Sequence, residues 1–183
     1  MFRLLNGIIG FVMFLYPLAV YLGIQTLQPW KISAALLVIL LVRLCLFPAD
    51  KQWGRVLIGV GALYFLFAVW DNSALSLRLY PVVVNLCLFL LFAVSLAYPP
   101  PAIERLARLQ HPNLSAQGVS YTRKVTYIWS AFFIVNASIA AGTALWANFF
   151  WWSLYNGCIA YLLIGLLMGI EYLVRIRMLP HEH

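Results

Sequence analysis

Acidic residues are scarce in this chain. Its 183 residues include 5 Asp and Glu against 12 Lys and Arg, and charged residues make up only 9% of the whole. An average soluble domain carries about 25% charged residues, which keep its surface hydrated. The scarcity of charge therefore argues against a soluble globular protein.

Cysteine and histidine are also few. The three cysteines lie inside apolar runs without a CxxC spacing, which argues against a disulfide framework or a zinc site. The three histidines, His111, His181 and His183, do not suggest a metal triad or a Ser-His-Asp arrangement. The sequence also lacks a Walker loop and a dinucleotide-binding fingerprint. We therefore expect no metal and no cofactor, and the sequence favours a non-enzymatic protein.

Apolar residues, by contrast, make up 64% of the chain. A domain of about 150 residues still leaves roughly 30% of its unfolded surface exposed, so lipid must cover the surplus. The sequence predicts an all-α, polytopic membrane helical bundle in one domain over residues 1–183, with about six transmembrane helices. The expected spans are residues 4–23, 32–47, 56–70, 79–97, 127–146 and 151–174.

Three of these spans leave alternatives to weigh. Run 4–23 follows a basic residue as a signal peptide would, but it is long for one and has no small-residue cleavage site, so we expect it to stay as a span. Runs 32–47 and 56–70 are shorter than the about 20 residues that a helix needs to cross a bilayer. A re-entrant pair is the alternative for these two.

A different kind of segment follows the fourth span. Three successive prolines at 99–101 end the helix, because proline has no N–H to donate. In residues 102–110, apolar and charged side chains take opposite helical faces, with Ile103, Leu106 and Ala107 on one and Glu104, Arg105 and Arg108 on the other. This pattern predicts a short amphipathic helix lying on the membrane surface.

The distribution of basic residues predicts the orientation. Short cytoplasmic loops collect Lys and Arg. With six spans and a cytoplasmic N-terminus, ten of the 12 basic residues fall inside and two, Lys31 and Arg78, fall outside. We expect a multi-pass protein of the bacterial inner (cytoplasmic) membrane with both termini in the cytoplasm. Basic residues spread between apolar runs in this way also argue against nucleic acid as a partner.

Polar residues within the spans are the first candidate site, because such residues are costly in a membrane and often functional. Glu171 can serve a proton or substrate role, although an interfacial ion pair with Arg175, Arg43 or Lys124 is the favoured interpretation. Three amides at the depth of the spans can converge on a polar pocket or act as helix-to-helix contacts, and we favour the contacts. The candidate intramembrane residues are Glu171, Asn136, Asn156, Asn85 and Arg43.

Small residues at helical spacing occur in the last two spans. Gly165 and Gly169 form a GxxxG motif, and Ser138 and Gly142 form a similar pair. Small side chains let membrane helices approach closely. We expect these residues to pack the last two spans together as a hairpin, in preference to a dimer.

Several motifs of the second half carry a resemblance to known families. They include Tyr80-Pro81-Val82-Val83-Val84-Asn85, Pro101-Ala102-Ile103-Glu104-Arg105-Leu106-Ala107, Tyr121-Thr122-Arg123-Lys124-Val125 and Trp152-Ser153-Leu154-Tyr155-Asn156-Gly157. This half resembles a family of bacterial inner-membrane proteins encoded within clusters for aryl-polyene or xanthomonadin-type lipids. It is also similar, more distantly, to the intracellular septation protein A family.

The resemblance implies a place beside fatty-acid-synthase-like enzymes and acyl carrier proteins. A basic inner surface of Arg105, Arg108, Arg123 and Lys124 suits an acidic carrier protein or anionic membrane lipid, although topology alone also explains these charges. The leading hypothesis is a non-enzymatic platform for an aryl-polyene-type acyl lipid pathway. The alternatives are a transporter of a lipid intermediate or protons, and an envelope or septation scaffold.

Overall fold

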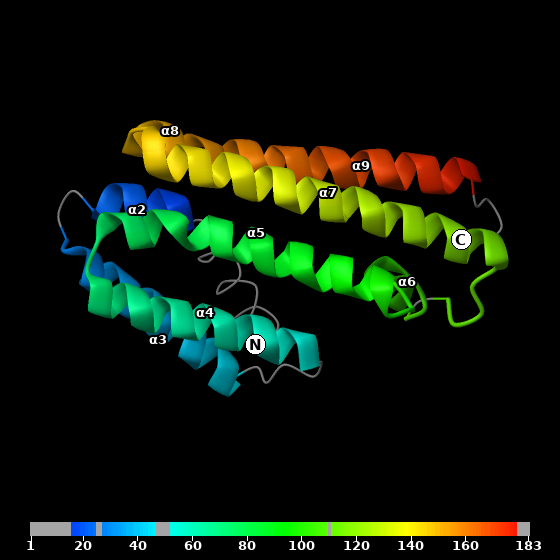
Figure 1. The fold of residues 1–183 in the computed structure, drawn as a ribbon, viewed down its shortest axis with the longest axis horizontal. Coiled ribbons are helices and arrows are strands. Elements are labelled where there is room, and N and C mark those ends of the chain that lie inside the picture. The colour runs from blue at the N-terminus through cyan, green and yellow to red at the C-terminus, as the bar shows by residue number, and fades with distance from the viewer. Residues whose placement is uncertain (1–15, 25–26, 47–51, 110, 179–183) are drawn as a thin grey trace. The chain divides into compact units, whose positions relative to one another are not determined.

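The computed structural model describes residues 16–24, 27–46, 52–109 and 111–178, and every regular element in these residues is a helix (Figure 1). The expected all-α fold is confirmed for this part of the chain. The elements in order are α2 (Tyr16–Gly23), α3 (Pro29–Leu46), α4 (Gln52–Asp71), α5 (Ala74–Ala97), α6 (Ala102–Ala107), α7 (Ala116–Trp146), α8 (Phe149–Leu154), the π-helix η1 (Tyr155–Ile159) and α9 (Ala160–Met178).

Three helical stretches are long and apolar enough to cross a membrane, namely Ala74–Ala97, Ala116–Trp146 and Phe149–Arg177. The shortest has 24 residues. At 1.5 Å per residue it is about 36 Å long, which exceeds the about 30 Å of a bilayer's hydrocarbon core. These stretches contain the expected spans 79–97, 127–146 and 151–174, so helices of membrane type are confirmed there.

The two short apolar runs belong to longer helices. Run 32–47 lies largely in α3, which has 18 residues, and run 56–70 lies in α4, which has 20. The two helices pack against each other (Figure 1). Of the first expected span, α2 covers residues 16–23, and residues 4–15 lie outside the described residues.

The chain divides into two compact units. The first comprises Met1–Val84 and Ile139–Ile159, and the second comprises Asn85–Ser138 and Ala160–His183. The first unit has an apolar core to which α2, α3, α4, α5, α7 and α8 all contribute. The buried members of this core are Val20, Ile32, Leu36, Leu40, Phe65, Leu77, Ala144 and Trp152.

The turn between α4 and α5 has its polar groups satisfied locally and by a neighbouring helix. Asn72 adopts a left-handed backbone conformation (φ 48°), which Asn tolerates better than most residues. Its Oδ1 accepts a hydrogen bond of 3.0 Å from the N–H of Trp30, in the first turn of α3. Ser73 Oγ accepts the Ser76 N–H at 3.1 Å and so caps α5. Hydrogen bonds from the Ser73 and Ser76 hydroxyls hold the pKa of the Asp71 carboxyl below its usual value.

Arg78, in the second turn of α5, joins three elements of the first unit. Its Nη2 donates to the carbonyl oxygens of Thr143 and Ala147 at the end of α7. The guanidinium carbon lies 4.9 Å from the centroid of the Phe149 ring. The Arg78 carbonyl oxygen in turn accepts from Trp152 Nε1 at 2.9 Å. A helix C-terminus has unpaired carbonyls and a partial negative charge, and a guanidinium compensates both.

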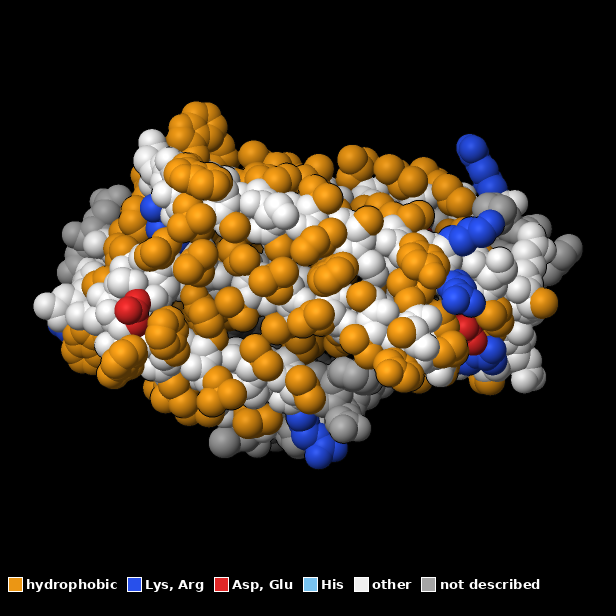
Figure 2. All heavy atoms as spheres, viewed as in Figure 1, with side chains coloured by type: hydrophobic (Ala, Val, Ile, Leu, Met, Phe, Trp, Pro, Cys, Tyr) orange, Lys and Arg blue, Asp and Glu red, His pale blue; other side chains and the backbone are white. Residues whose placement is uncertain are grey.

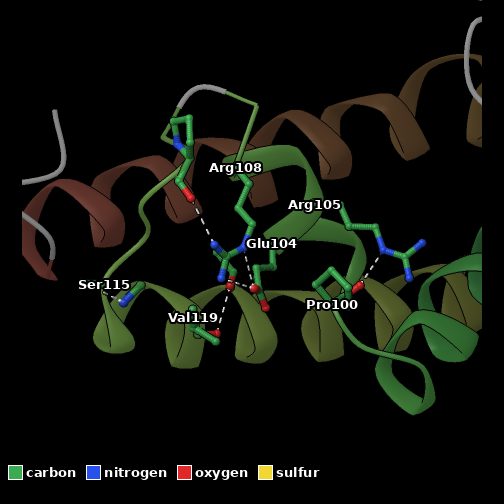
Figure 3. A network of polar contacts seen from close by, with 9 residues as sticks. Pro100, Glu104, Arg105, Arg108, Ser115 and Val119 are labelled. Carbon is green, nitrogen blue, oxygen red and sulfur yellow. Dashed lines mark hydrogen bonds and ion pairs between the residues drawn. The ribbon is translucent and has the colours of Figure 1, made fainter.

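In the second unit, α6 differs from the expected surface helix. It ends at Ala107, before residue 110 of the expected segment. Glu104 is only 5% exposed, so it does not lie on an open polar face as expected, whereas Leu106 of the apolar face is 60% exposed. The reason is the ion pair between Glu104 and Arg108, in which Arg108 Nε and Nη2 lie 2.8 and 2.7 Å from Glu104 Oε1 (Figure 3). A carboxylate can turn inward when a guanidinium accompanies it.

We expect Arg78→Met to lower the stability of the first unit. The change leaves the last carbonyls of α7 without their donor, at a cost of about 2 kcal/mol. For a chain of this length that corresponds to a fall in Tm of roughly 4–8 °C. Thermal unfolding of the variant and of the unmodified protein, both purified in mild detergent, measures this fall in Tm. Arg55→Met, at an exposed position of α4, is the control, and an equal fall in both variants would contradict the role of Arg78.

Candidate functional site

Basic side chains gather at one end of the second unit. This end is formed by α6, the start of α7 and the end of α9 (Figure 2). Arg123 and Lys124 are exposed there on α7, and Arg177 is exposed on α9. Away from this end the helix surfaces are largely hydrophobic (Figure 2). The second unit thus has one polar, cationic end and an apolar remainder.

Tyr121 connects α7 to α9 at this end. Its hydroxyl donates to the backbone carbonyl oxygen of Glu171 at 3.0 Å and lies 3.3 Å from Glu171 Oε1. Arg175 Nε is 3.9 Å from the same carboxylate oxygen. The expected ion pair of Glu171 with Arg175 is therefore present, and the carboxylate also receives a tyrosine hydroxyl.

A cavity of about 600 Å³ lies on one side of this contact. We call it the aromatic cavity, because three rings of its wall pack against one another. The centroids of Phe92 and Phe133 are 5.2 Å apart, and those of Trp129 and Phe133 are 5.5 Å apart. Its apolar wall comprises Leu88, Phe92, Ile103, Leu106, Ala107, Leu114, Val125, Trp129, Phe133 and Met168.

The polar lining of the aromatic cavity comes from the basic end of the unit. It comprises His111, Tyr121, Thr122, Glu171 and Arg175. On α7, Tyr121 and Thr122 precede Val125, Trp129 and Phe133, so polarity falls along the helix. The cavity therefore has the distribution of polarity that suits an amphiphile, with a polar group at one end and a chain below it.

A second hollow of about 440 Å³ lies on the other side of the Tyr121–Glu171 contact. We call it the lysine groove. Gln117, Ser120 and Lys124 form its polar part, and its apolar part consists of Val125, Ile128, Trp129, Leu167, Ile170 and Val174. Tyr121, Val125, Trp129 and Glu171 line both hollows.

The three amides serve two separate contacts. Asn136 Nδ2 donates to Asn85 Oδ1 at 2.9 Å and links α7 to α5 in the second unit. Asn156, in the first unit, donates to Thr143 Oγ1 at 3.2 Å and to the Trp152 carbonyl oxygen at 2.9 Å. Each contact has the geometry of the helix-to-helix interpretation. The side chain of Arg43 lies outside the described residues.

The four basic residues of the expected docking surface differ in their surroundings. Arg105 donates through Nε to the Pro100 carbonyl oxygen at 2.6 Å (Figure 3). Its Nη2 donates to the Tyr98 carbonyl oxygen at 3.0 Å. Arg108 is paired with Glu104 and also donates to the Pro112 carbonyl oxygen at 3.1 Å. Arg123 and Lys124 are exposed. Docking of an acyl carrier protein on this surface stays a prediction.

The glycine motif of α9 is not used for packing in the described residues. A Cβ atom built at Gly165 or Gly169 meets no other atom within 4 Å. A Cβ at Gly142 meets only the Trp146 ring of its own helix, and Ser138 is exposed and bonds the Ile134 carbonyl oxygen. These small residues therefore do not form the expected contact of the last two spans.

The cavities bring together residues that the sequence did not present as a site. Tyr121, Val125, Trp129 and Phe133 recur every fourth residue along α7, and all four line the aromatic cavity. This spacing places them on one helical face. The same spacing is typical of ordinary helix packing, so it does not by itself distinguish a cavity wall from a core.

The walls of the two hollows are mainly apolar with a few polar groups, which suits the binding of a ligand. The described residues contain no group of three or more His, Cys, Asp and Glu side chains that could hold a metal ion. A scan against models of protein families, a search of curated proteins and a search of solved structures found no match to this chain.

We expect Tyr121→Phe to weaken the attachment of α9 to α7. The variant keeps the ring in the wall but removes the hydroxyl that donates to Glu171, which contributes about 1 kcal/mol. Tyr127→Phe removes the hydroxyl of an exposed tyrosine on the same helix and is the control. Thermal unfolding of the two variants in mild detergent provides the comparison. Equal stability of both would show that the Tyr121 hydroxyl contributes nothing to the contact.

Proposed function

We propose that this protein holds the acyl chain of a lipid intermediate at the cytoplasmic face of the bacterial inner membrane, as a non-enzymatic subunit of an aryl-polyene-type pathway. The observation that carries the proposal is the aromatic cavity, an apolar space of about 600 Å³ with one polar end. Its volume lies within the roughly 300–1,000 Å³ range of small-molecule sites.

The walls of the cavity favour a flat, conjugated chain. Phe92, Trp129 and Phe133 line the cavity, and the Phe133 centroid lies 5.2 Å from that of Phe92 and 5.5 Å from that of Trp129. Aromatic pairs in offset or edge-to-face arrangement gain about 0.5–1.5 kcal/mol beyond the burial of their area. A polyene has a π-system along its length and can make such contacts, whereas a saturated chain gains only burial.

The polar end supports an acidic or thioester-linked head at the cytoplasmic face. Arg175 and His111 line this end, and Arg123, Lys124 and Arg177 are exposed on α7 and α9 at the same basic end of the unit. Glu171 is engaged by Tyr121 and Arg175, so its charge is partly compensated. A carboxyl or phosphate group is therefore attracted to the site more than a cationic head would be.

Two neighbouring residues of α9 provide a matched test of chain binding. Met168 lines the aromatic cavity and Leu167 lines the lysine groove, and neither lines both. We expect Met168→Trp to fill the aromatic cavity and lower labelling by a photoactivatable long-chain fatty acid about tenfold, equivalent to about 1.4 kcal/mol. Leu167→Trp should keep the labelling. Intact-protein mass spectrometry after illumination in phosphatidylcholine vesicles measures both.

Competition then identifies the kind of chain. A conjugated polyenoic acid should displace the photoactivatable probe at lower concentration than a saturated acid of the same length. Equal labelling of Met168→Trp and the unmodified protein would contradict the cavity as the binding site. Equal competition by the two acids would contradict the preference for a polyene.

The proposal includes a topology of six spans with both termini in the cytoplasm. Support comes from the three helices of membrane length, from the 18 and 20 residues of α3 and α4, and from the basic end of the second unit. We expect a reporter at the C-terminus to be active in the cytoplasm, and a reporter inserted at Leu75 to be active in the periplasm. A periplasmic C-terminus would refute the six-span arrangement.

A further inference from the structure

The lysine groove is separate from the cavity on which the proposed function rests. It opens outward, because Ile128, Ile170 and Val174 are exposed along it. In a membrane, these apolar side chains face lipid. The groove is therefore accessible from the bilayer, without passage through the aromatic cavity.

Polarity changes along the groove in the order of a phospholipid. The residues that line it on α7 run from Gln117 to Trp129, a length of about 18 Å at 1.5 Å per residue. Gln117, Ser120 and Lys124 come first, and Val125, Ile128 and Trp129 follow. The polar residues match the head group and glycerol of a phospholipid, and the apolar residues match the upper part of an acyl chain.

The charge of the groove selects an anionic head. Lys124 is exposed at its polar end and is its basic residue. The acidic residue of the groove, Glu171, accepts a hydrogen bond from Tyr121 and lies 3.9 Å from Arg175 Nε. Lys124 is exposed and belongs to neither ion pair of the described residues, so its ammonium group is available to an anionic lipid.

We propose that the lysine groove binds an anionic phospholipid of the bilayer, with the phosphate at Lys124 and one acyl chain against Ile128, Leu167 and Ile170. This site is additional to the chain-binding site of the aromatic cavity. The two share the Tyr121–Glu171 contact and the Trp129 ring.

The test uses vesicles of equal phosphatidylglycerol and phosphatidylcholine that contain the full chain. After mild extraction, native mass spectrometry counts the lipids that stay bound. We expect phosphatidylglycerol to be retained over phosphatidylcholine by about fivefold, because one basic residue attracts a head group with net negative charge more than a zwitterionic one. Lys124→Gln should bring the ratio close to one.

Arg123→Gln is the matched control, because Arg123 is exposed beside Lys124 but lines neither hollow. It should keep the preference, whereas Leu167→Trp should reduce retention of both lipids. An equal effect of Arg123→Gln and Lys124→Gln would show a general surface charge and overturn the site. The site would also be overturned if Leu167→Trp retained both lipids as the unmodified protein does. The same holds if free fatty acid, in place of phospholipid, were found bound.

The same variants separate this site from the proposed function. Met168→Trp should lower labelling by the fatty acid probe and leave the phosphatidylglycerol preference unchanged. If that preference is absent while Met168→Trp still lowers labelling, the groove site is refuted and chain binding stands. If the preference is present and Met168→Trp has no effect on labelling, chain binding in the aromatic cavity is refuted and the groove site stands.

Discussion

Lipid offers the backbone no hydrogen-bond partner, and a membrane protein must therefore satisfy its helix ends with its own groups. In the first unit, side chains from neighbouring elements meet this requirement. Arg78 of α5 donates to the last carbonyls of α7, and Asn72 accepts from Trp30 at the start of α3. Each of these bonds joins two elements as well as capping one. The positions of the helices in this unit therefore depend on how their ends are satisfied.

Hydrogen-bond partners within the chain account for most of the polar residues that the sequence presents as candidates. Asn156 bonds a carbonyl and a hydroxyl, Asn136 bonds Asn85, and Arg105 bonds two carbonyls of the loop after α5. A polar residue within a membrane helix is thus ambiguous until its partners are known. What distinguishes Lys124 is its place at the polar end of an apolar hollow, where a ligand can reach it.

Hydropathy predicted the long helices because apolar runs of that length have few alternatives in a membrane. It underestimated α3 and α4, whose polar flanks at 29–31 and 52–55 are also helical. The burial of Glu104 on α6 could not be predicted, because a six-residue helix offers few positions for a pattern and Glu104 pairs with Arg108. The two hollows could not be predicted from the sequence either, because they depend on the distance between helices. The expected approach of helices at Gly165 and Gly169 is not observed.

The shared wall gives the two proposed sites a physical connection. Trp129 lines both hollows and is partly buried, and its ring packs 5.5 Å from that of Phe133. A chain in the aromatic cavity and a lipid in the lysine groove would therefore both contact this ring. Coupling between binding sites is reciprocal. The preference for phosphatidylglycerol that Met168→Trp is expected to keep therefore also limits how far an anionic lipid in the groove can change the affinity of a chain in the cavity.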